Sequence, residues 1–501
     1  MLLINPPVVK PSEPPAGIAK LIGCLKDHGM AVRVLDANVE GILHLLHQPK
    51  TVSDTWTDRS YRHLQSNRTF LNGWPGYENA ARYRRAVADV NRVLETAGKD
   101  RAVKISLADY HDPLLSPVKS ADLLQAAEKP EANPFYDYFQ KRLTALLDED
   151  GPDLIGLSLN YLSQALCTFS MIGFLKKEYP SLSIILGGGL VTSWMQRPDW
   201  RNPFSGLVDD MIAGPGEAAI LSMLGIQRSD CRTLPDYRLF PLDDYVAPGC
   251  ILPYSTASGC YWRRCAFCPE KAEGNPYRPS APQLVAEDIR TLAGQTKPAL
   301  IHLLDNALSP SVLRTIAKQP PGAPWYGFTR ITHHLKELDF CRTLKKSGCT
   351  MLKLGIESGD QGVLDALQKG IDLETASGAL KSLQEAGIAV YVYLLFGTPP
   401  ESMAEARRTL DFTVRHADRI GFLNLAIFNM PVCGADHEAL RSKPFYEGDL
   451  SLYSAFDHPK GWSRGRVRQF LDREFKRHPA VASILKRDPP FFTSNHAPFF
   501  T

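Results

Sequence analysis

The chain has 501 residues, of which 44% are hydrophobic and 22% charged, and its formal net charge is +3. This length suggests roughly two to four domains, and the apolar content is sufficient for packed cores. The small net charge gives no indication of nucleic-acid or membrane-surface binding. The start of the chain, M-L-L-I-N-P-P, lacks the features of a signal peptide, and no run reaches the about 18 apolar residues of a membrane span. We therefore expect a soluble, cytoplasmic protein.

The first 43 residues predict a strand, a loop, a helix and a second strand. Residues 2–4 form a short apolar strand that Asn5-Pro6-Pro7 ends. Residues 17–28 have the apolar spacing of a helix, and residues 32–35 give the next strand. This order is typical of the beginning of a doubly wound α/β domain.

Residues 45–140 interrupt the α/β pattern, because they are rich in Trp, Tyr, Arg and Asn and carry no strong strand signal. We interpret them as an insertion within one domain that spans residues 1–225. The pattern resumes with a buried strand at 153–159 and a helix at 163–179. A strand then runs into Gly187-Gly188-Gly189, and Gly214, Gly216 and Glu217 follow another apolar stretch. Strands that end in glycines bring the backbone close to a ligand at the carboxyl edge of a sheet, although tight turns explain such glycines equally well.

Residues 226–249 contain several prolines and are interpreted as a linker, after which strand–helix units return over residues 250–430. Repeated units of this kind predict a complete or partial (β/α) barrel, in which functional residues lie at the carboxyl ends of the strands. The predicted strands are 299–304, 325–328, 350–354, 389–396 and 419–428. The residues at their ends are Asp305, Arg330, Glu357, Ser358 and Gly397.

A C-terminal extension covers residues 431–501. It is basic and rich in aromatic residues, which is unusual for a solvated tail. We therefore expect an ordered cap rather than a disordered end. The aromatic residues in question are Phe456, Trp462, Phe470, Phe475, Phe491 and Phe492.

Three cysteines lie within nine residues, in S-G-C-Y-W-R-R-C-A-F-C-P-E: Cys260, Cys265 and Cys268. Three thiolates so close in sequence can hold three irons of a [4Fe–4S] cluster and leave the fourth iron open. Pro269 follows the motif directly, which favours a loop over a helix. A structural zinc site that includes Cys250 is the main alternative, although its spacing matches no common zinc module. Ordinary unliganded thiols are a second alternative, whereas ten cysteines without a secretory signal do not indicate a disulfide framework.

The motifs together resemble those of radical S-adenosylmethionine (SAM) enzymes that carry a cobalamin-binding domain, a group called class B when its members methylate. The resemblance covers about residues 1–43, 151–225 and 250–430. It implies an N-terminal Rossmann-like cobalamin-binding domain, followed by a partial TIM-type barrel that holds the cluster and SAM.

In the barrel, the resemblance implies that Cys260, Cys265 and Cys268 ligate the cluster. Phe267 corresponds to the aromatic residue beside the adenine of SAM. Glu357 and Ser358, in L-G-I-E-S-G, match a strand-end motif whose carboxylate holds the ribose hydroxyls; a surface glutamate at a turn is the alternative. The remaining SAM-binding candidates are Arg330, for the SAM carboxylate or a barrel-end salt bridge, and Gly397 and Glu401 beside the adenine.

In the first domain, the resemblance implies a set of residues that line the cobalamin. They are Asn5, Pro6, Pro7, Ser158, Gly187, Gly188, Gly189, Thr192, Gly214, Gly216 and Glu217. Ordinary Rossmann turns remain the alternative for this set.

Two departures from the family pattern are visible. The spacing between the first two cysteines is one residue longer than the usual C-x3-C-x2-C. The D-x-H-x-x-G motif, whose histidine ligates cobalt in other cobalamin proteins, has Asn38 in the place of histidine and follows the second strand rather than the first. We therefore expect cobalt without a protein histidine below it.

The resemblance implies an enzyme that cleaves SAM to a 5′-deoxyadenosyl radical, with an electron from flavodoxin or ferredoxin, and methylates an unactivated carbon. A non-methylating radical rearrangement or cyclisation on the same architecture is an alternative. A zinc-containing binding module is an alternative from another class. A methylthiotransferase-like enzyme is disfavoured, because no second cysteine triad is present. The substrate is not indicated, and residues 45–140 and the C-terminal extension are the segments expected to recognise it.

Overall fold

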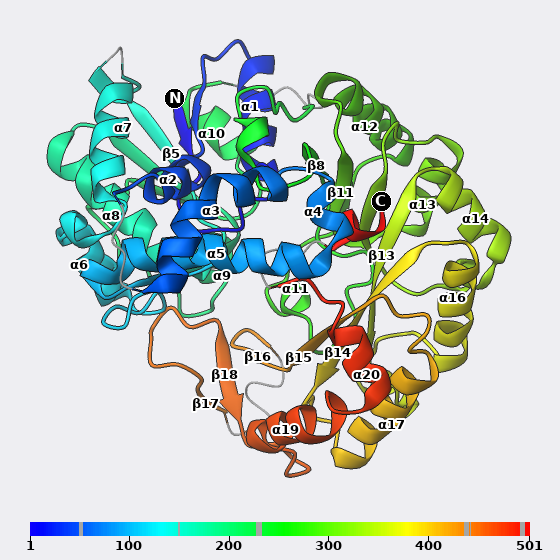
Figure 1. Cartoon of the computed structure of the whole chain (residues 1–501). Coiled ribbons are helices and arrows are strands. Elements are labelled where there is room, and N and C mark those ends of the chain that lie inside the picture. The colour runs from blue at the N-terminus through cyan, green and yellow to red at the C-terminus, as the bar shows by residue number, and fades with distance from the viewer. Residues whose placement is uncertain (50–53, 149–150, 227–232, 435–439, 441, 491–495) are drawn as a thin grey trace. The chain divides into compact units, whose positions relative to one another are not determined.

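The computed structural model describes residues 1–49, 54–148, 151–226, 233–434, 440, 442–490 and 496–501 (Figure 1). The chain divides into two compact units. The first consists mainly of Met1–Cys250, joined by Tyr446–Leu452, and the second mainly of Ile251–Phe445 and Tyr453–Pro489. Each unit is built on its own parallel sheet, so the positions of the functional residues follow from the strand ends of each sheet.

The first unit contains a five-stranded parallel sheet in the order β2-β1-β5-β6-β7. Because β2 lies on one side of β1 and β5 on the other, the strand order reverses between β1 and β5, where doubly wound sheets bind ligands. The strands are β1 (Leu2–Ile4), β2 (Arg33–Leu35), β5 (Leu154–Ser158), β6 (Ser183–Gly187) and β7 (Asp210–Ile212).

Helices follow the strands of this sheet, as the α/β pattern predicts. One of them, α8, is buried along most of its length, which explains why it is apolar on nearly all sides. These helices are α1 (Ala16–Asp27), α2 (Ala37–Leu46), α8 (Leu162–Glu178), α9 (Gly189–Met195) and α10 (Glu217–Met223).

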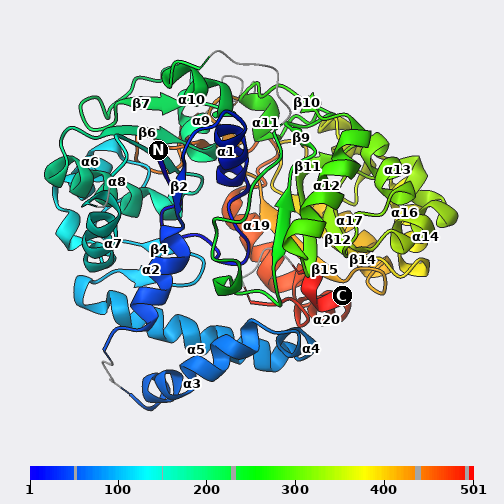
Figure 2. The ribbon, with the colours of Figure 1, turned by 90° about the horizontal axis from the view of Figure 1, so that it is seen from above.

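The insertion between β2 and β5 is largely helical, and two of its helices, α3 and α5, lie side by side (Figure 2). Its helices are α3 (Thr55–Leu71), α4 (Pro75–Glu78), α5 (Ala80–Gly98), α6 (Ser120–Glu128) and α7 (Tyr136–Asp148). It also contains a two-stranded antiparallel ribbon, β3 (Lys104–Ile105) with β4 (Tyr110–His111), which the sequence did not predict because each strand has only two residues.

The second unit contains a six-stranded parallel sheet in the order β15-β14-β13-β12-β11-β8, with β8 and β15 at its edges. This open sheet with flanking helices is a partial TIM-type barrel and confirms the predicted fold class. The strands are β8 (Ile251–Tyr254), β11 (Leu300–Leu308), β12 (Trp325–Thr329), β13 (Cys349–Glu357), β14 (Ala389–Phe396) and β15 (Phe422–Ile427).

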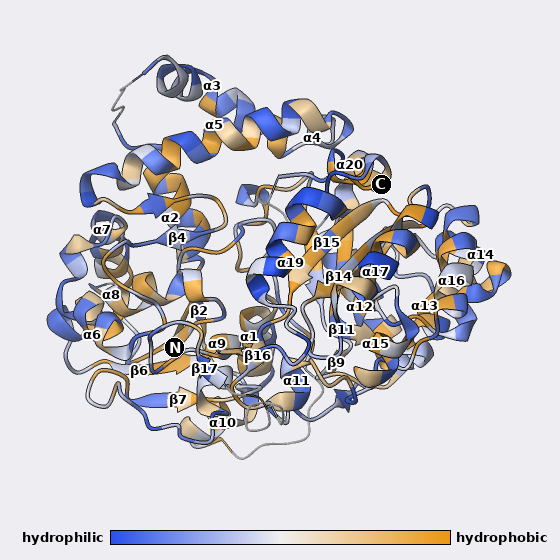
Figure 3. Cartoon of the chain, turned by 90° about the horizontal axis from the view of Figure 1, so that it is seen from below, coloured by the Kyte–Doolittle hydropathy of each residue, from blue (hydrophilic) through white to orange (hydrophobic). Residues whose placement is uncertain are grey.

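Several helices of the second unit, among them α12, α13, α14 and α16, lie along one side of this sheet (Figure 1). Figure 3 shows the hydrophobic strands β14 and β15 near α17 and α19, which carry many hydrophilic residues. The helices are α11 (Pro269–Ala272), α12 (Pro282–Thr296), α13 (Pro310–Lys318), α14 (Leu338–Lys346), α15 (Gln361–Ala366), α16 (Leu373–Glu385), α17 (Met403–Arg415), α19 (Arg464–Phe470) and α20 (Pro479–Leu485).

Short elements complete the chain. The strands among them are β9 (Ala257–Ser258), β10 (Arg278–Pro279), β16 (Met430–Pro431), β17 (Ser442–Pro444) and β18 (Tyr453–Phe456). The short 3-10 helices are Lys99–Arg101, Pro130–Ala132, Leu242–Asp244, His333–Lys336 and Ala497–Phe500, and Leu471–Phe475 is a π-helix.

Two details of the sheet differ from the sequence prediction. The strand β8 was missed because it contains Pro253, which removes one backbone donor; an edge strand tolerates this, and β8 is an edge strand. Asp305 was predicted to follow a strand, but β11 continues to Leu308, with an irregular register against β12 after Leu303. Asp305 therefore lies within β11 rather than at its end.

The aromatic residues of the C-terminal extension are packed. The rings of Phe470 and Phe475 lie 6.2 and 5.2 Å from the ring of Phe396, the last residue of β14. Phe456 contacts Phe428 in the same way, at 5.7 Å. The Trp462 ring lies 5.9 Å from the Phe470 ring. The remaining two aromatic residues of the prediction, Phe491 and Phe492, lie outside the described residues. Across the described part of the chain, no helix has both the length and the apolarity needed to cross a membrane.

Candidate functional site

The cysteine motif forms a loop between β9 and α11 in the second unit. Cys265 is buried, and Cys260 and Cys268 are half-buried. Burial raises the pKa of the Cys265 and Cys268 thiols, and the charge of Cys260 acts on both of them. The three predicted thiols therefore lie in one short loop and influence one another electrostatically.

Positive charge and backbone amides oppose the effect of burial on these thiols. Lys369 and Arg330 lower the pKa of the Cys265 thiol, although burial remains the larger influence. For the Cys268 thiol, the backbone amides of Lys271 and Glu270 act in the same direction. These groups favour thiolates, which are the form of cysteine that binds metal.

Arg330 follows β12 and is buried beside Cys265. Its Nη1 lies 3.8 Å from the Cys265 Sγ, and its Nη2 donates a hydrogen bond to the Lys369 carbonyl. The guanidinium also lies over the Trp262 ring, 4.1 Å from the centroid. Arg330 is therefore placed at the cysteine loop, whereas its predicted role toward the SAM carboxylate stays a prediction.

Glu357 is the last residue of β13, and its carboxylate is paired with Lys369. The Glu357 Oε1 and Lys369 Nζ are 2.7 Å apart, and both side chains are almost fully buried. The Lys369 ammonium also lies 5.6 Å from the centroid of the Phe267 ring. The structure thus brings together two predicted residues, Glu357 and Phe267, through a lysine that the sequence analysis missed. A lysine before a glycine is common at a helix end, so Lys369 carried no distinctive signal.

Ser358 is buried, and its hydroxyl takes part in a network of hydrogen bonds with another hydroxyl and a backbone amide. Its hydroxyl lies 3.2 Å from the Thr409 Oγ1 and accepts a hydrogen bond from the Asp360 amide. The Thr409 hydroxyl also accepts the Gly359 amide, at 2.9 Å. This network fixes the turn after β13 against α17, so the visible contacts of Ser358 are structural.

Gly397 and Glu401 are joined directly after β14. The Gly397 amide donates to the Glu401 Oε2 at 2.5 Å, and the Trp462 indole donates to the same oxygen at 2.9 Å. Burial raises the pKa of the Glu401 carboxyl to about 7. Its other oxygen, Oε1, is buried and has no hydrogen-bond partner among the described residues. The carboxyl therefore holds the shape of the glycine turn.

Asp305, whose role the sequence did not define, ties β11 to the segment that leads into the cysteine loop. Its carboxylate accepts hydrogen bonds from the Thr256 amide at 3.0 Å and the Thr256 hydroxyl at 2.6 Å. This segment lies just before β9 and Cys260. Asp305 is thus a support for the loop.

In the first unit, the loop after β1 is tied to its neighbours at the point where the strand order reverses. The Asn5 amide donates to Asp36 at 3.0 Å, and the Gln164 amide reaches the Asn5 Oδ1 at 3.3 Å and the Pro6 carbonyl at 2.7 Å. Asn5, Pro6 and Pro7 are all buried. The polar groups of this loop are therefore engaged within the unit.

The loops after β5 and β6 are linked in the same way. Asn160 donates to the Ser158 hydroxyl at 3.0 Å and accepts the Gly189 amide at 2.9 Å. Gly188 has φ +113°, and a Cβ there would lie 2.4 Å from the Leu159 carbonyl oxygen, so a glycine is needed for this approach.

The next loop extends this network. Thr192 accepts the Gly214 amide and donates to the Gly188 carbonyl, both at 2.9 Å. Gly187 accepts the Leu159 amide. Gly216 precedes α10, whose first residue, Glu217, pairs with Lys20 at 2.5 Å. The predicted cobalamin residues thus share the carboxyl edge of one sheet.

Asn38, which replaces histidine in the D-x-H-x-x-G-like sequence, has a structural role. Its side chain exchanges two hydrogen bonds of 2.9 Å with the backbone of Val9. Asp36 precedes α2 and caps it through the amides of Asn38 and Val39. This segment fixes the loop after β1.

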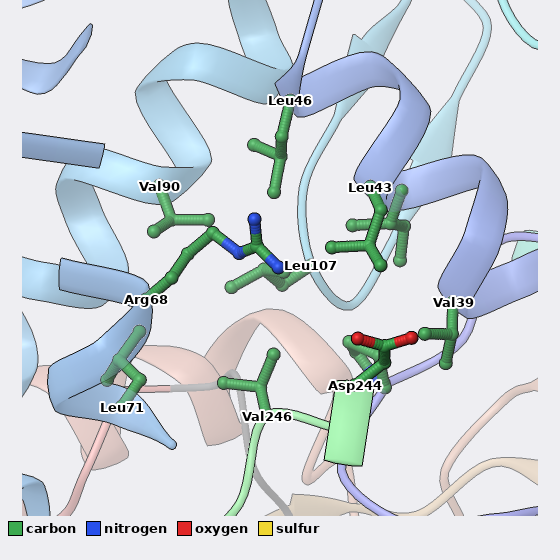
Figure 4. Close-up of a pocket in the computed structure, with 11 residues that line it drawn as sticks. Val39, Leu43, Leu46, Arg68, Leu71, Val90, Leu107, Asp244 and Val246 are labelled. Atoms are coloured by element: carbon green, nitrogen blue, oxygen red, sulfur yellow. The ribbon is translucent and has the colours of Figure 1, made fainter. Parts of the chain in front are cut away.

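A small apolar pocket in the first unit lies between α2, α3 and α5 (Figure 4). Arg68 and Asp244 face it from opposite sides. Its cavity volume is about 10 Å³, which holds no more than about one water molecule. It is therefore too small for a cofactor.

Comparison with known proteins identifies the class. Residues 254–413 match the model of the radical SAM superfamily. An uncharacterized methyltransferase of Pyrococcus horikoshii is 25% identical over 197 residues, which are 37% of this chain and 42% of that protein. The hopanoid C-3 methylase of Methylococcus capsulatus is 23% identical over 283 residues, which are 50% of this chain and 54% of that protein. The matched region thus spans about half of these relatives or less.

Solved structures match over more of the chain. The radical SAM methyltransferase TsrM of Kitasatospora setae, solved with tryptophan substrate and a SAM analog, has a TM-score of 0.55 and 14% identity, covering 97% of this chain and 89% of that chain. The cobalamin-dependent radical SAM enzyme OxsB, with aqua-cobalamin and SAM bound, has a TM-score of 0.50 and 15% identity, covering 84% and 52%. These likenesses concern the fold.

Residues 254–413 of the chain therefore form a radical SAM domain. More particularly, its fold resembles that of the methyltransferase TsrM and the cobalamin-dependent enzyme OxsB.

Proposed function

We propose that this chain binds a [4Fe–4S] cluster, SAM and cobalamin, and that it methylates an unactivated carbon of its substrate. The observation that supports the proposal is the short loop of the radical SAM domain that carries Cys260, Cys265 and Cys268, where Arg330 Nη1 lies 3.8 Å from the Cys265 Sγ. Beside this loop, Lys369 links Glu357 to the Phe267 ring. The names of the relatives, among them methyltransferases and a methylase, support the methyl transfer.

The donor set of the second unit fits a cluster with an open iron. Three thiols are available in one loop. Burial raises the pKa of the Cys265 and Cys268 thiols, and nearby cations and backbone amides offset part of that rise. When bound, the cluster supplies the electron that cleaves SAM to methionine and a 5′-deoxyadenosyl radical. In this chain Cys265 is buried, which shields that ligand from solvent. The proposed electron donor is a reduced flavodoxin or ferredoxin.

The residues around the thiols are suited to bind and orient SAM. Phe267 offers an aromatic face for the adenine, and Glu357 offers a carboxylate for the ribose hydroxyls. Because Lys369 now holds that carboxylate, the ribose must share it with the ammonium or replace it. The Glu401 carboxyl keeps the Gly397 turn in place, so that its backbone can approach the adenine.

The proposed cobalamin site lies at the carboxyl edge of the sheet in the first unit. Gly189 and Gly214 are exposed there, and the surrounding loops are held by hydrogen bonds within the unit. Loops that are already fixed lose little entropy on binding. When bound, cobalamin supplies the methyl group, and these loops position it.

The proposal is tested by anaerobic reconstitution with iron, sulfide and cobalamin, followed by incubation with methyl-labelled SAM, a chemical reductant and cell extract. We expect 5′-deoxyadenosine together with a labelled product. A preparation that binds cobalamin and produces 5′-deoxyadenosine, but never transfers label, would contradict methylation.

That last outcome would favour a radical reaction without methyl transfer. One relative gives this candidate a basis: the anaerobic magnesium-protoporphyrin IX monomethyl ester cyclase of Rubrivivax gelatinosus, 26% identical over 193 residues that cover 36% of this chain and 34% of that protein. Analysis of unlabelled products in the same extract distinguishes the two reactions.

A further inference from the structure

Three consecutive carbonyls of the turn after α15 are held by the cysteine loop and by Arg330. The Leu367 carbonyl accepts the Ala266 amide at 2.9 Å, and the Gln368 carbonyl accepts the Trp262 indole Nε1 at 3.0 Å. The Lys369 carbonyl accepts the Arg330 Nη2. The turn is therefore fixed by donors at three successive residues, and two of these donors belong to the segment between Cys260 and Cys268.

Trp262 is central to this arrangement, because it makes contacts of three kinds. Besides its hydrogen bond to Gln368, its ring receives the Arg330 guanidinium at 4.1 Å. Its indole also packs against Gly370, where a Cβ would lie only 2.1 Å from the Trp262 Cζ2. Gly370 has φ +66°, so the residue that touches the indole must be small and must adopt a left-handed conformation.

The position of this turn determines where Lys369 lies. Lys369 is buried, with 4% of its surface exposed. Its Nζ lies 2.7 Å from the Glu357 Oε1 and also lies over the Phe267 ring. A movement of the turn would therefore shift the ammonium, the carboxylate and the aromatic ring together. Arg330, which Trp262 covers, also contacts Cys265 at 3.8 Å.

We propose that Trp262 is a positioning residue for SAM, which acts by fastening the cysteine loop to the turn at residues 367–370. The four-residue spacing between Cys260 and Cys265, one residue longer than in the usual motif, provides the length in which this anchor is placed. The inference rests on the proposed function, because it assigns Trp262 a role at the SAM site of that enzyme.

The test compares Trp262→Phe and Trp262→Ala with the wild type after anaerobic reconstitution. The SAM dissociation constant is measured by equilibrium dialysis, and the reduced cluster by electron paramagnetic resonance with and without SAM. Trp262→Phe keeps an aromatic ring but loses the donor to Gln368, so we expect SAM binding about fivefold weaker. Trp262→Ala also loses the ring beneath Arg330, so we expect a loss of at least about tenfold.

A pair of glycine variants tests the contact from the other side. Gly370→Ala introduces both a strained φ and a clash with the indole. Gly387→Ala introduces the same kind of strain, since Gly387 has φ +73°, but the nearest atom is the flexible Lys345 Cε at 3.9 Å. We expect Gly370→Ala to lose SAM binding, and Gly387→Ala to lower the melting temperature while binding SAM like the wild type.

The outcomes separate this inference from the proposed function. A wild-type protein that holds no iron–sulfur cluster would overturn the proposed function itself. A wild type that binds SAM, together with Trp262 variants that bind SAM equally well and give the same spectra, would overturn the role of Trp262 alone. Equal loss of SAM binding in Gly370→Ala and Gly387→Ala would also contradict it, because backbone strain would then explain both.

Discussion

Lys369 and Glu357 form an ion pair of 2.7 Å whose two side chains are almost completely buried. Glu357 ends β13, whereas Lys369 lies 12 residues later, after α15. The pair thus closes the β13–α15 unit beside the cysteine loop. An ion pair removed from water is costly to break on one side only, because the remaining charge is left without a partner.

Replacement of Lys369 by Met is therefore expected to destabilise the protein. The buried Glu357 carboxylate would lose its counter-charge, at a cost of about 3–5 kcal/mol in the free energy of unfolding. Urea unfolding of the metal-free protein measures this. The double variant Lys369→Met/Glu357→Gln should recover part of the loss. The control is Lys381→Met, which removes an exposed pair with Glu385 and should cost less than about 1 kcal/mol. If Lys369→Met and Lys381→Met lowered the free energy of unfolding equally, the importance of the buried pair would be contradicted.

Glu401 gives the stability a specific pH dependence. Burial raises the pKa of this carboxyl from 4.5 to about 7 in the folded protein. Between these values the unfolded chain has lost a proton that the folded protein retains, so this group makes the free energy of unfolding fall as pH rises from about 4.5 to 7. The Gln side chain of Glu401→Gln cannot ionise. As the pH rises from about 4.5 to 7, the free energy of unfolding of this variant should therefore increase relative to that of the wild type. Unfolding curves at pH 5, 6, 7 and 8 measure the shift, and a constant difference would contradict it.

Gly188→Ala is expected to abolish cobalamin binding to the first unit. The added Cβ would lie 2.4 Å from the Leu159 carbonyl oxygen, so the loops after β5 and β6 must separate. Gly206→Ala is the matched control, because Gly206 has φ +85° but no atom within 4 Å of the added Cβ. Cobalamin uptake is measured by visible absorption after gel filtration. Normal uptake by Gly188→Ala would show that these loops do not form the cobalamin site.

The fold was largely predictable because both sheets are parallel and buried, which gives short apolar strands alternating with helices. The same logic placed Glu357 and Gly397 at strand ends. Pro253 concealed β8, since its tolerance at an edge depends on sheet order, which a single sequence does not reveal.

The parts of the site that were not predicted depend on contacts between distant segments. Lys369 meets Glu357, and Trp262 meets Gln368, only because two loops approach each other in the folded chain. The extra residue in the cysteine motif was visible in the sequence, but its consequence for Trp262 was not. The roles of the cluster, SAM and cobalamin residues stay predictions.

The central claim is that Cys260, Cys265 and Cys268 hold a [4Fe–4S] cluster that cleaves SAM. The most direct measurement is the iron, sulfide and zinc content of anaerobically reconstituted protein, together with 5′-deoxyadenosine formation from SAM and a reductant. We expect about four irons per wild-type chain, none retained stably by Cys265→Ala, and 5′-deoxyadenosine from the wild type alone. Cys250→Ala, the control for the zinc alternative, should match the wild type. Zinc without iron in the wild type, or 5′-deoxyadenosine from Cys265→Ala, would contradict the account.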